Sequence, residues 1–503
     1  MGLDSVLTLC ATGASGKLGP TKVSFILYVY WFGVTTGFNQ MLGGPISGSK
    51  DDWNWDNRSS LSEPTEQFIF LNAVLRTVLP TIFNNAIPAY RGSSVFGVTQ
   101  TYDTDTLLNY GYSTLNLSAS EYTTLETDVL ARGNFAGWRS AFQVWYGLRN
   151  PIAITIAAST FTTANMPNGS HYIVASNGLI DPVSGFPNPT KWTPITLPNG
   201  VNQSYYTFQW HTVPSASAFT NADISYIKGS ANTYSYPDTV PGTTSAARDA
   251  DIDAMIGMTS SLTDNQKAIA EFWAGITNTV SPPGMSMWFW KKYIETYNLA
   301  TRQNTMKFIY SGFHLALGLF EGGRLCWELK YDNMQDRPIQ EVRRRYAGSN
   351  VPSWNGTVLG DNWLPYQPST FVTPPFPDFP SGHSVFSRVM ASVMTAWFGP
   401  NFPQERPPQN LADLNLMSPA YTYGTTASQP FGTIVFPAGK SHVESGVPAT
   451  DQTLSWNSWI EIAEQAGLSR QCGGIHPLGA HLGSVNMVNS MFPIMSSNWG
   501  LPY

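Results

Sequence analysis

The sequence predicts a mainly α-helical protein, a large helical bundle with an irregular or partly β insertion in its middle. In the first and last parts of the 503-residue chain, apolar residues recur at spacings of three and four, which is the period of an amphipathic helix. The middle instead carries Asn-Gly and Pro-Gly turn signals among many Ser, Thr and Tyr residues. We therefore divide the chain into residues 1–158, helical, residues 159–247, irregular, and residues 248–503, helical and carrying the chemistry.

The composition is that of a folded globular protein, with 42% hydrophobic, 13% aromatic and 12% charged residues. The net charge of -6 excludes the global basic field that binds nucleic acid or anionic membranes. The apolar stretch 25–34 is shorter than the roughly 20 residues that span a bilayer, and residues 1–20 lack the pattern of a secretory signal. We expect a soluble protein with no membrane span, for which a secreted or extracytoplasmic location stays open.

The expected helices follow the order of the chain. The first covers residues 66–86, with a kink at Pro80. Further helices are expected at residues 262–275, 287–301, 305–330, 381–398, 454–466 and 478–491. A Pro- and Gly-rich connector, 351–380, precedes the fourth of these, and the basic run Arg343-Arg344-Arg345 is interpreted as a solvated face.

Two cations stand near the end of the helix expected at 305–330. Lys330 and Arg337 are seven positions apart, about two turns on one face of a continuous helix, and Pro338 ends regular structure close by. Both side chains can therefore point into one cleft.

A second segment, Pro380-Ser381-Gly382-His383, opens the next helix. Ser381 is a favoured N-cap residue, and the N–H of Gly382 is one of the unpaired donors that face an anion at a helix start. His383 is then held beside that anion. Such a four-residue string arises by chance only about 0.003 times in a chain of this length.

A third segment, residues 469–476, reads Ser-Arg-Gln-Cys-Gly-Gly-Ile-His. Arg470 and His476 are out of phase on a single helix, but Gly473-Gly474 can bend the chain and bring them together. Each segment alone is commonplace, whereas the three in this order form a strong signal for a tetrahedral oxyanion. The three cysteines are far apart and odd in number, so they predict neither a disulfide framework nor a CxxC metal site.

The pattern K-x6-R-P, P-S-G-H and S-R-x5-H resembles the phosphatidic-acid-phosphatase type 2 superfamily, which includes acid phosphatases, lipid phosphatases and vanadium haloperoxidases. The resemblance covers residues 262–485. Chain length, the absence of membrane spans and the phrase LTDNQKAIAEFWAG followed by SPPG favour the vanadium haloperoxidase branch, and with it a fold of the haloperoxidase and acid phosphatase type.

The resemblance implies vanadate as cofactor, with His476 as the ligand that binds vanadium. Lys330, Arg337 and Arg470 would neutralise the vanadate oxygens, Ser381 and the Gly382 N–H would donate to them, and His383, with Lys330, would be catalytic, His383 as acid–base. The implied reaction oxidises chloride, bromide or iodide with hydrogen peroxide and releases hypohalous acid. An organic acceptor and a homo-oligomer, dimeric or larger, are open alternatives for the partners.

Trp327 and Phe376 stand where chloroperoxidase-type relatives carry the aromatic residues of the halide pocket, which favours a chloride-capable pocket. Two positions depart from the family pattern. The acid four positions after the metal-binding His is replaced by Ala480, and the Asp that follows Phe-Trp-Ala is replaced in the Gly275-Ile276 pair. Asp264 or Glu271 are candidates for the missing acids.

Four alternatives are weighed against this interpretation. The same site serves an acid phosphatase, with His476 as nucleophile and His383 protonating the leaving group, or a non-catalytic helical protein that binds an oxyanion. The string Gly382 to Phe386 is similar to the G-x-S-x-G elbow of α/β-hydrolases but fails at its fifth position. Zinc hydrolysis has no HExxH motif to support it.

Overall fold

The computed structural model describes most of the chain. The described residues are 2–12, 19–41, 61, 63–82, 94–95, 98–99, 113–150, 173–175, 178–180, 190–201, 203, 210, 213–238, 243–275, 279–300, 304–418, 420 and 428–501. Within these ranges the fold is mainly α-helical, with short two-stranded hairpins, so the fold class expected from the sequence is confirmed.

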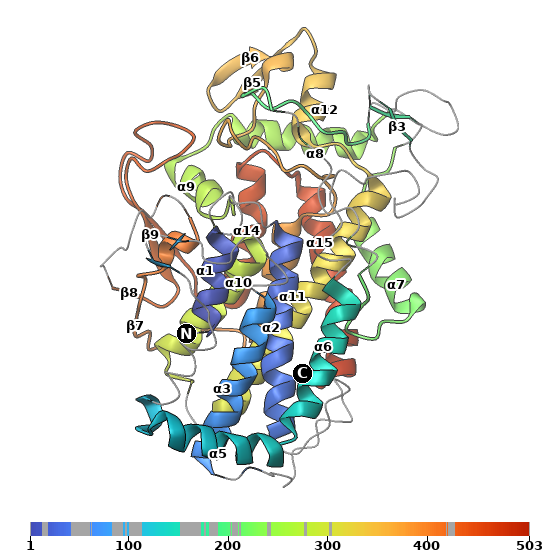
Figure 1. Cartoon of the computed structure of the whole chain (residues 1–503). Helices are drawn as coiled ribbons and strands as arrows, with labels where there is room; N and C mark the ends of the chain where they lie inside the picture. The colour runs from blue at the N-terminus through green and yellow to red at the C-terminus, as the bar shows by residue number, and fades with distance from the viewer. Residues whose placement is uncertain are drawn as a thin grey trace.

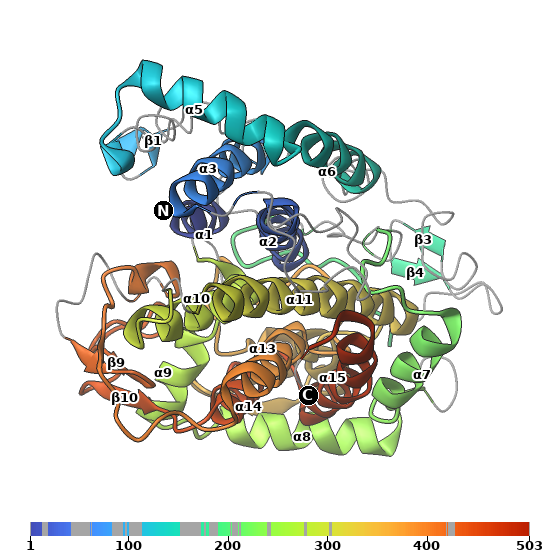
Figure 2. The ribbon, with the colours of Figure 1, turned by 90° about the horizontal axis from the view of Figure 1, so that it is seen from below.

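The N-terminal helices form a layer along the long central helix α11 (Thr305–Asn333). They are α1 (Gly2–Thr12), α2 (Pro20–Met41), α3 (Pro64–Pro80), α5 (Ala119–Arg132) and α6 (Phe135–Asn150). Figure 2 shows α3, α5 and α6 on the outer side of α2, with α11 on the inner side. Apolar side chains surround α2, as expected of a helix that is packed on nearly every face.

The middle of the chain combines short hairpins with helices. Strands β1 (Ser94–Val95) and β2 (Val98–Thr99) pair, as do β3 (Ile173–Ala175) and β4 (Gly178–Ile180). Helix α7 (Asn221–Asn232) begins with a capping box between Thr220 and Asp223, and α8 (Ala246–Thr259) begins after Ser245. The region 159–247 is therefore partly β, as expected, but it also contains α7, which was not among the expected helices.

The C-terminal helices are α9 (Asp264–Phe272), α10 (Ser281–Thr296), α12 (Pro338–Arg345), α13 (Gly382–Phe398), α14 (Trp459–Cys472) and α15 (Leu478–Trp499). Of these, α13, α14 and α15 lie on the side of α11 away from α2, whereas α10 lies in the same layer as α11 and also packs against α2 (Figures 1 and 2). Helix α14 starts at Trp459 and not at 454, because β10 (Gln452–Ser455) pairs antiparallel with β9 (Thr433–Phe436). Helix α15 continues past 491 and accommodates Pro493 in its interior.

Short elements connect these helices. Strands β5 (Asn350–Ser353) and β6 (Gly356–Leu359) form a hairpin in which Val351 faces Val358, and β7 (Pro408–Gln409) pairs with β8 (Gln429–Pro430). Two 3₁₀ turns, η10 (Gly360–Asn362) and η11 (Leu414–Leu416), complete the order. The connector 351–380 is thus mostly irregular, with one hairpin at its start.

Close packing of small residues sets α13 against α11. A Cβ at Gly318 would lie 2.7 Å from Val389, and one at Gly322 would lie 3.0 Å from Val385, so glycine lets the two helices approach. The start of α13 is thereby fixed beside the C-terminal half of α11. One hydrophobic core includes residues from Val6 to Leu501, and the boundaries at 158 and 247 stay a prediction.

The basic run on α12 differs from the expected solvated face. All three arginines are half-buried. Arg343 donates to the carbonyl of Trp363, Arg344 pairs with Asp336 at 3.1 Å and Arg345 pairs with Asp253 at 3.0 Å. None of the helices in the described ranges is long and apolar enough to cross a membrane.

Candidate oxyanion site

The three sequence segments meet in the interior, where α11, α13 and α14 have their ends. Lys330 lies in the last turn of α11, and Ser381, Gly382 and His383 open α13. Arg470 lies in the last turn of α14. Five residues of these segments are at most 3% exposed: Lys330, Arg337, Ser381, Arg470 and His476. The residues selected from the sequence therefore form one buried cluster.

Lys330 and Arg337 reach the cluster from two helices and not from one face of a single helix. Helix α11 ends at Asn333 and its C-cap residue Met334 has φ 48°, whereas α12 begins with Arg337 as its N-cap and Pro338 in its first turn. Proline is favoured there because its missing N–H would have no intrahelical partner. The two cations converge as expected, but the expectation that they lie on one continuous helix was wrong.

The turn after α14 carries Arg470 and His476 to the same place. Gly474 has φ +67°, the N–H of Gly474 donates to the carbonyl of Gln471, and that of Ile475 donates to the carbonyl of Arg470. This pattern is a Schellman motif, in which the left-handed position favours glycine. The bend expected at Gly473-Gly474 is present.

Lys330 is fully engaged by backbone carbonyls. Its Nζ donates to the carbonyl oxygens of Pro377 at 3.1 Å and Asp378 at 2.8 Å, and to that of Pro380. An ammonium has three N–H groups, so Lys330 ties the loop before α13 together and contributes its charge to the cluster. Burial lowers the pKa of Lys330 to about 7, and the nearby Arg337 adds to this effect.

The two arginines each keep one nitrogen without a partner among the described residues. Arg337 donates from Nε to the carbonyl of Phe376 at 2.8 Å and from Nη1 to that of Ile475 at 3.1 Å, which leaves Nη2. Arg470 donates from Nε to Ser469 and from Nη2 to the carbonyl of Ala270, which leaves Nη1. Burial lowers the pKa of Arg337 to about 10 and that of Arg470 to about 9.

Ser381 and His383 present two further polar atoms. Ser381 is the N-cap of α13, yet its Oγ caps no N–H and has no partner in the described part of the chain. The same holds for Nε2 of His383. Burial, and then the charges of Arg470 and His476, hold the pKa of His383 well below its ordinary value, so this imidazole is neutral at pH 7.

His476 has an acidic partner that the sequence patterns did not indicate. Its Nδ1 lies 2.5 Å from Oδ1 of Asp378, and its Nε2 lies 3.1 Å from Nη1 of Arg337. Burial lowers the pKa of His476 to about 3, although Asp378 opposes the shift. The pKa of Asp378 is lowered despite its burial, because of His476, Arg248 and Arg337.

Asp264 and Glu271, named above as substitutes for the missing acids, lie elsewhere. Asp264 accepts from the N–H of Ala449, and Glu271 accepts from Ser441, Tyr366 and the N–H of His442. Ala480 is buried, and its carbonyl accepts from the N–H of Ser381. Ile276 lies outside the described residues. The acid beside His476 is Asp378, and only its presence in the string PPFPDFPSGH hinted at it.

Trp327 and Phe376 pack together against the cations. Their ring centroids are 4.8 Å apart. The Nζ of Lys330 lies 5.2 Å from the Phe376 ring and 5.7 Å from the Trp327 ring, and Cζ of Arg337 lies 4.9 Å from Phe376. Cation–π attraction therefore supports the two buried charges.

The cluster has the chemistry of an anion site. Three buried cations have lowered pKa values, chiefly because burial disfavours their charged forms. Four polar atoms from three segments have no partner among the described residues: Arg337 Nη2, Ser381 Oγ, His383 Nε2 and Arg470 Nη1. Fold and site together define a helical-bundle protein with a buried, cationic site suited to a tetrahedral oxyanion.

One segment of the chain matches a known protein domain. Residues 311–491 match the family described as the VCPO second helical-bundle domain. This segment is similar to that domain, which agrees with the resemblance to the vanadium haloperoxidase family stated from the sequence. A search of the curated proteins gave no significant match.

Solved structures show the same fold over nearly the whole chain. The holo-type bacterial vanadium-dependent chloroperoxidase is 16% identical, with a TM-score of 0.57, covering 97% of this chain and 93% of that one. The apo-type structure is 17% identical, with a TM-score of 0.62 and coverages of 97% and 95%. A bacterial vanadium-dependent iodoperoxidase is 14% identical, with a TM-score of 0.55 and coverages of 100% and 96%.

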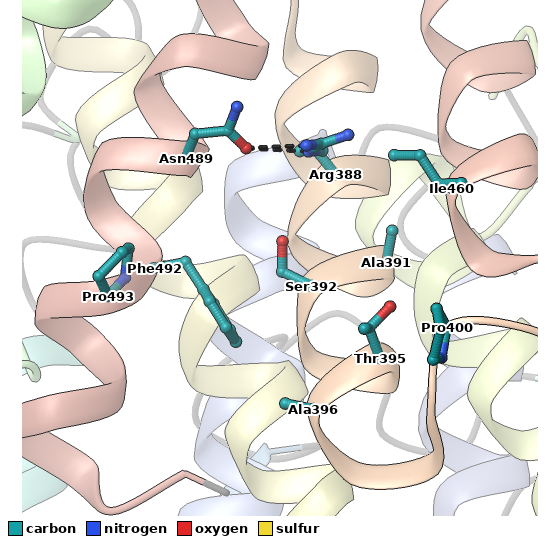
Figure 3. Close-up of a pocket in the computed structure, with 10 residues that line it drawn as sticks. All are labelled: Arg388, Ala391, Ser392, Thr395, Ala396, Pro400, Ile460, Asn489, Phe492 and Pro493. Carbon is teal, nitrogen blue, oxygen red and sulfur yellow. Dashed lines mark hydrogen bonds between the residues drawn. The ribbon is translucent and has the colours of Figure 1, made fainter. Parts of the chain in front are cut away.

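A surface cavity lies away from this cluster. It has a volume of about 720 Å³ and opens between α13, α14 and α15 (Figure 3). Ala391, Ser392 and Thr395 of α13 line it, and Arg388 crosses it to bond Asn489 of α15 at 2.9 Å. None of the candidate site residues lines this cavity.

Proposed function

We propose that this protein is a vanadate-dependent haloperoxidase that oxidises a halide with hydrogen peroxide to hypohalous acid. The observation that carries the proposal is the buried imidazole of His476, whose Nδ1 lies 2.5 Å from Oδ1 of Asp378 and whose Nε2 lies 3.1 Å from Nη1 of Arg337. A neutral imidazole with one nitrogen fixed by a carboxylate is a common metal ligand. The fold shared with vanadium-dependent chloroperoxidase and iodoperoxidase supports the choice of vanadate.

The residues present fit vanadate. His476 would bind the vanadium through Nε2, and Arg337 and Arg470 would donate to its oxygens from their unpartnered nitrogens. Ser381 Oγ and the first N–H groups of α13, that of Gly382 included, add neutral donors. Bound there, vanadate would supply Lewis-acid activation of hydrogen peroxide.

The other side chains act around that centre. Lys330 adds positive charge through the loop that it holds, without a spare N–H. His383, neutral and with Nε2 unpartnered, would accept a proton from the peroxide and return it later, as general acid–base catalysis requires.

Trp327 and Phe376 would shape the place where the halide approaches. Their rings lie beside Lys330 and Arg337, so a halide there would meet aromatic edges and a positive potential. We infer a pocket that accepts chloride as well as bromide and iodide.

Phosphate has the shape and charge of vanadate, so the test compares two reactions of the purified protein. With orthovanadate and hydrogen peroxide added, we expect oxidation of bromide or chloride, followed by bromination of a phenolic dye. Without vanadate, a generic aryl phosphate should be hydrolysed slowly or not at all. Phosphoester hydrolysis without halogenation would replace the proposal by an acid phosphatase with His476 as nucleophile, and vanadate binding without either activity would indicate a non-catalytic oxyanion-binding protein.

A further inference from the structure

Asp378 is a junction between the anion cluster and a second, fully buried ion-pair network. Its side chain is 0% exposed. Oδ1 lies 2.5 Å from Nδ1 of His476 and 3.6 Å from Nη1 of Arg337, while Oδ2 accepts from Nη1 of Arg248 at 3.0 Å. Oδ2 is therefore hydrogen-bonded to Arg248, while Oδ1 is in close contact with the His476 ring and near Arg337.

The position of this carboxylate is fixed from several directions. The backbone N–H of Asp378 donates to Gln335 at 3.0 Å, and its carbonyl accepts from Lys330 at 2.8 Å. Arg248, from α8, is itself held by Glu341 at 2.8 Å and by the carbonyl of Asp336 at 3.1 Å. Neither the backbone nor the carboxylate of Asp378 can turn away without breaking several of these bonds.

This arrangement determines which nitrogen of His476 carries the proton. A carboxylate is an acceptor only, so the atom facing it must be an N–H. The proton of the neutral ring then sits on Nδ1, and the lone pair sits on Nε2, the nitrogen that faces the cluster. The backbone of Asp378 and the ring of His476 come from segments 98 residues apart in the chain, and this contact brings the two side chains together.

We propose that Asp378 is the positioning residue of His476: it fixes the ring and its tautomer so that the Nε2 lone pair is directed at the centre of the bound oxyanion. The inference rests on the proposed function only for the identity of that oxyanion. It also assigns the role of the acid expected at position 480 to a residue of the loop that precedes α13. A purely structural ion pair with Arg248 would need no particular tautomer.

Replacing Asp378 by asparagine separates these two roles. Arg248 presents an N–H to one side of the group, so the amide oxygen of Asp378→Asn would turn to Arg248. The amide NH₂ would then face Nδ1 of His476 and require it to accept, which moves the ring proton to Nε2 and removes the lone pair. The substitution keeps the size of the side chain, and the tautomer is predicted to invert.

The chain offers a matched control in another buried histidine, His481. Nε2 of His481 lies 3.0 Å from Oε2 of Glu464, and its Nδ1 lies 3.0 Å from the hydroxyl of Ser384. Glu464→Gln makes the same chemical change at a histidine–carboxylate pair outside the anion cluster. It should leave His476 and anion binding unchanged.

The first measurement is the tautomer of His476 in protein labelled with ¹⁵N-histidine and free of vanadate, with His476→Gln used for assignment. We expect the Nδ1–H form in the wild type and in Glu464→Gln, and the Nε2–H form in Asp378→Asn. An Nε2–H ring in the wild type overturns the inference, even if Asp378→Asn fails to fold.

The second measurement is the equilibrium affinity for orthovanadate, with inorganic phosphate as a second probe. Loss of an outer partner of a metal-binding histidine weakens metal affinity about 10–100-fold, and we expect this loss in Asp378→Asn but not in Glu464→Gln. Wild-type affinity in Asp378→Asn overturns the inference. A wild type that binds neither anion overturns the proposed function instead, and the tautomer measurement still tests Asp378.

Discussion

At the scale of single residues, the engaged and the unpartnered nitrogens of the cluster have different tasks. Lys330 donates its N–H groups to three backbone carbonyls. Arg337 and Arg470, in contrast, each have one nitrogen without a partner in the described ranges. Charge-assisted hydrogen bonds from arginine to an oxyanion are directional and strong. We therefore expect the arginines to orient the anion and Lys330 to order the loop.

The two histidines of the cluster should separate binding from turnover. His476→Ala removes the proposed ligand, so vanadate should no longer be retained on gel filtration. His383→Ala leaves that ligand in place but removes a proton carrier, and turnover should fall about 10²- to 10⁴-fold. His442, which is exposed, provides the control His442→Ala. Full halide oxidation in either cluster variant would contradict the assignment.

His314 makes the stability of the protein sensitive to acid. It is 2% exposed and accepts from Nε1 of Trp397 at 3.1 Å, and burial lowers its pKa to about 3 from 6.5. Because the unfolded chain takes up the proton first, stability is lost as the pH falls from about 6.5 towards 3. Between pH 7 and pH 4.5 the contribution is about 2–3 kcal/mol.

Urea unfolding of the wild type and of His314→Gln at both pH values measures this contribution. The free energy of unfolding should fall less for His314→Gln, because glutamine does not titrate. Equal losses for the two proteins would show that His314 is not the source.

At the scale of elements, the turn after α14 places Arg470 and His476, so its geometry should affect anion binding. Gly474→Ala puts a side chain on a residue with φ +67°, and its Cβ would lie 3.0 Å from Pro365. The left-handed conformation costs about 1–2 kcal/mol for a non-glycine residue. We expect lower stability together with weaker binding of vanadate or phosphate.

Gly439 has nearly the same conformation, φ +68°, with no atom near its missing Cβ. Gly439→Ala should therefore lose similar stability in thermal unfolding while keeping anion affinity. If both variants bound the anion like the wild type, the turn would not control the site.

The helices and caps of the C-terminal half could be predicted from sequence because they depend on local chemistry. The start of α9 at Thr263 and the Schellman turn at Gly474 are examples. The start of α14 could not be predicted, since residues 452–455 are recruited by a strand 16 or more positions earlier. Helix α7 was missed because its polar, Ser- and Asn-containing sequence is helical only where Ile227 and Ala231 are buried.

At the scale of the molecule, the members of the site could be selected from motifs, but their partners could not. Asp378 and Arg248 carry no periodic or motif signal, and their contacts join α8 to the loop before α13 across 130 positions. The suggestion that Asp264 or Glu271 stands in for the missing acids was wrong for the same reason. A long-range ion pair is decided by how the helices pack, which a single sequence does not state.

The excess of buried positive charge predicts that oxyanions stabilise the whole protein. An anion that binds only the folded state adds about 2.7 kcal/mol at a concentration one hundred times its Kd. Thermal unfolding in orthovanadate, compared with sodium chloride at equal ionic strength, should show a higher Tm. No change in Tm at saturating vanadate would contradict a preformed anion site.

Helix α2 has a consequence for anyone who wishes to isolate the catalytic half. The Trp31 ring lies against Gly312 of α11, and Tyr28 stacks on Phe320 at 4.9 Å. A recombinant fragment that began after residue 247 would leave these α11 positions as an uncovered aromatic surface in water. Such a fragment would be expected to aggregate in the cell, and supplying α2 in trans, as a co-expressed peptide, would be the way to recover it.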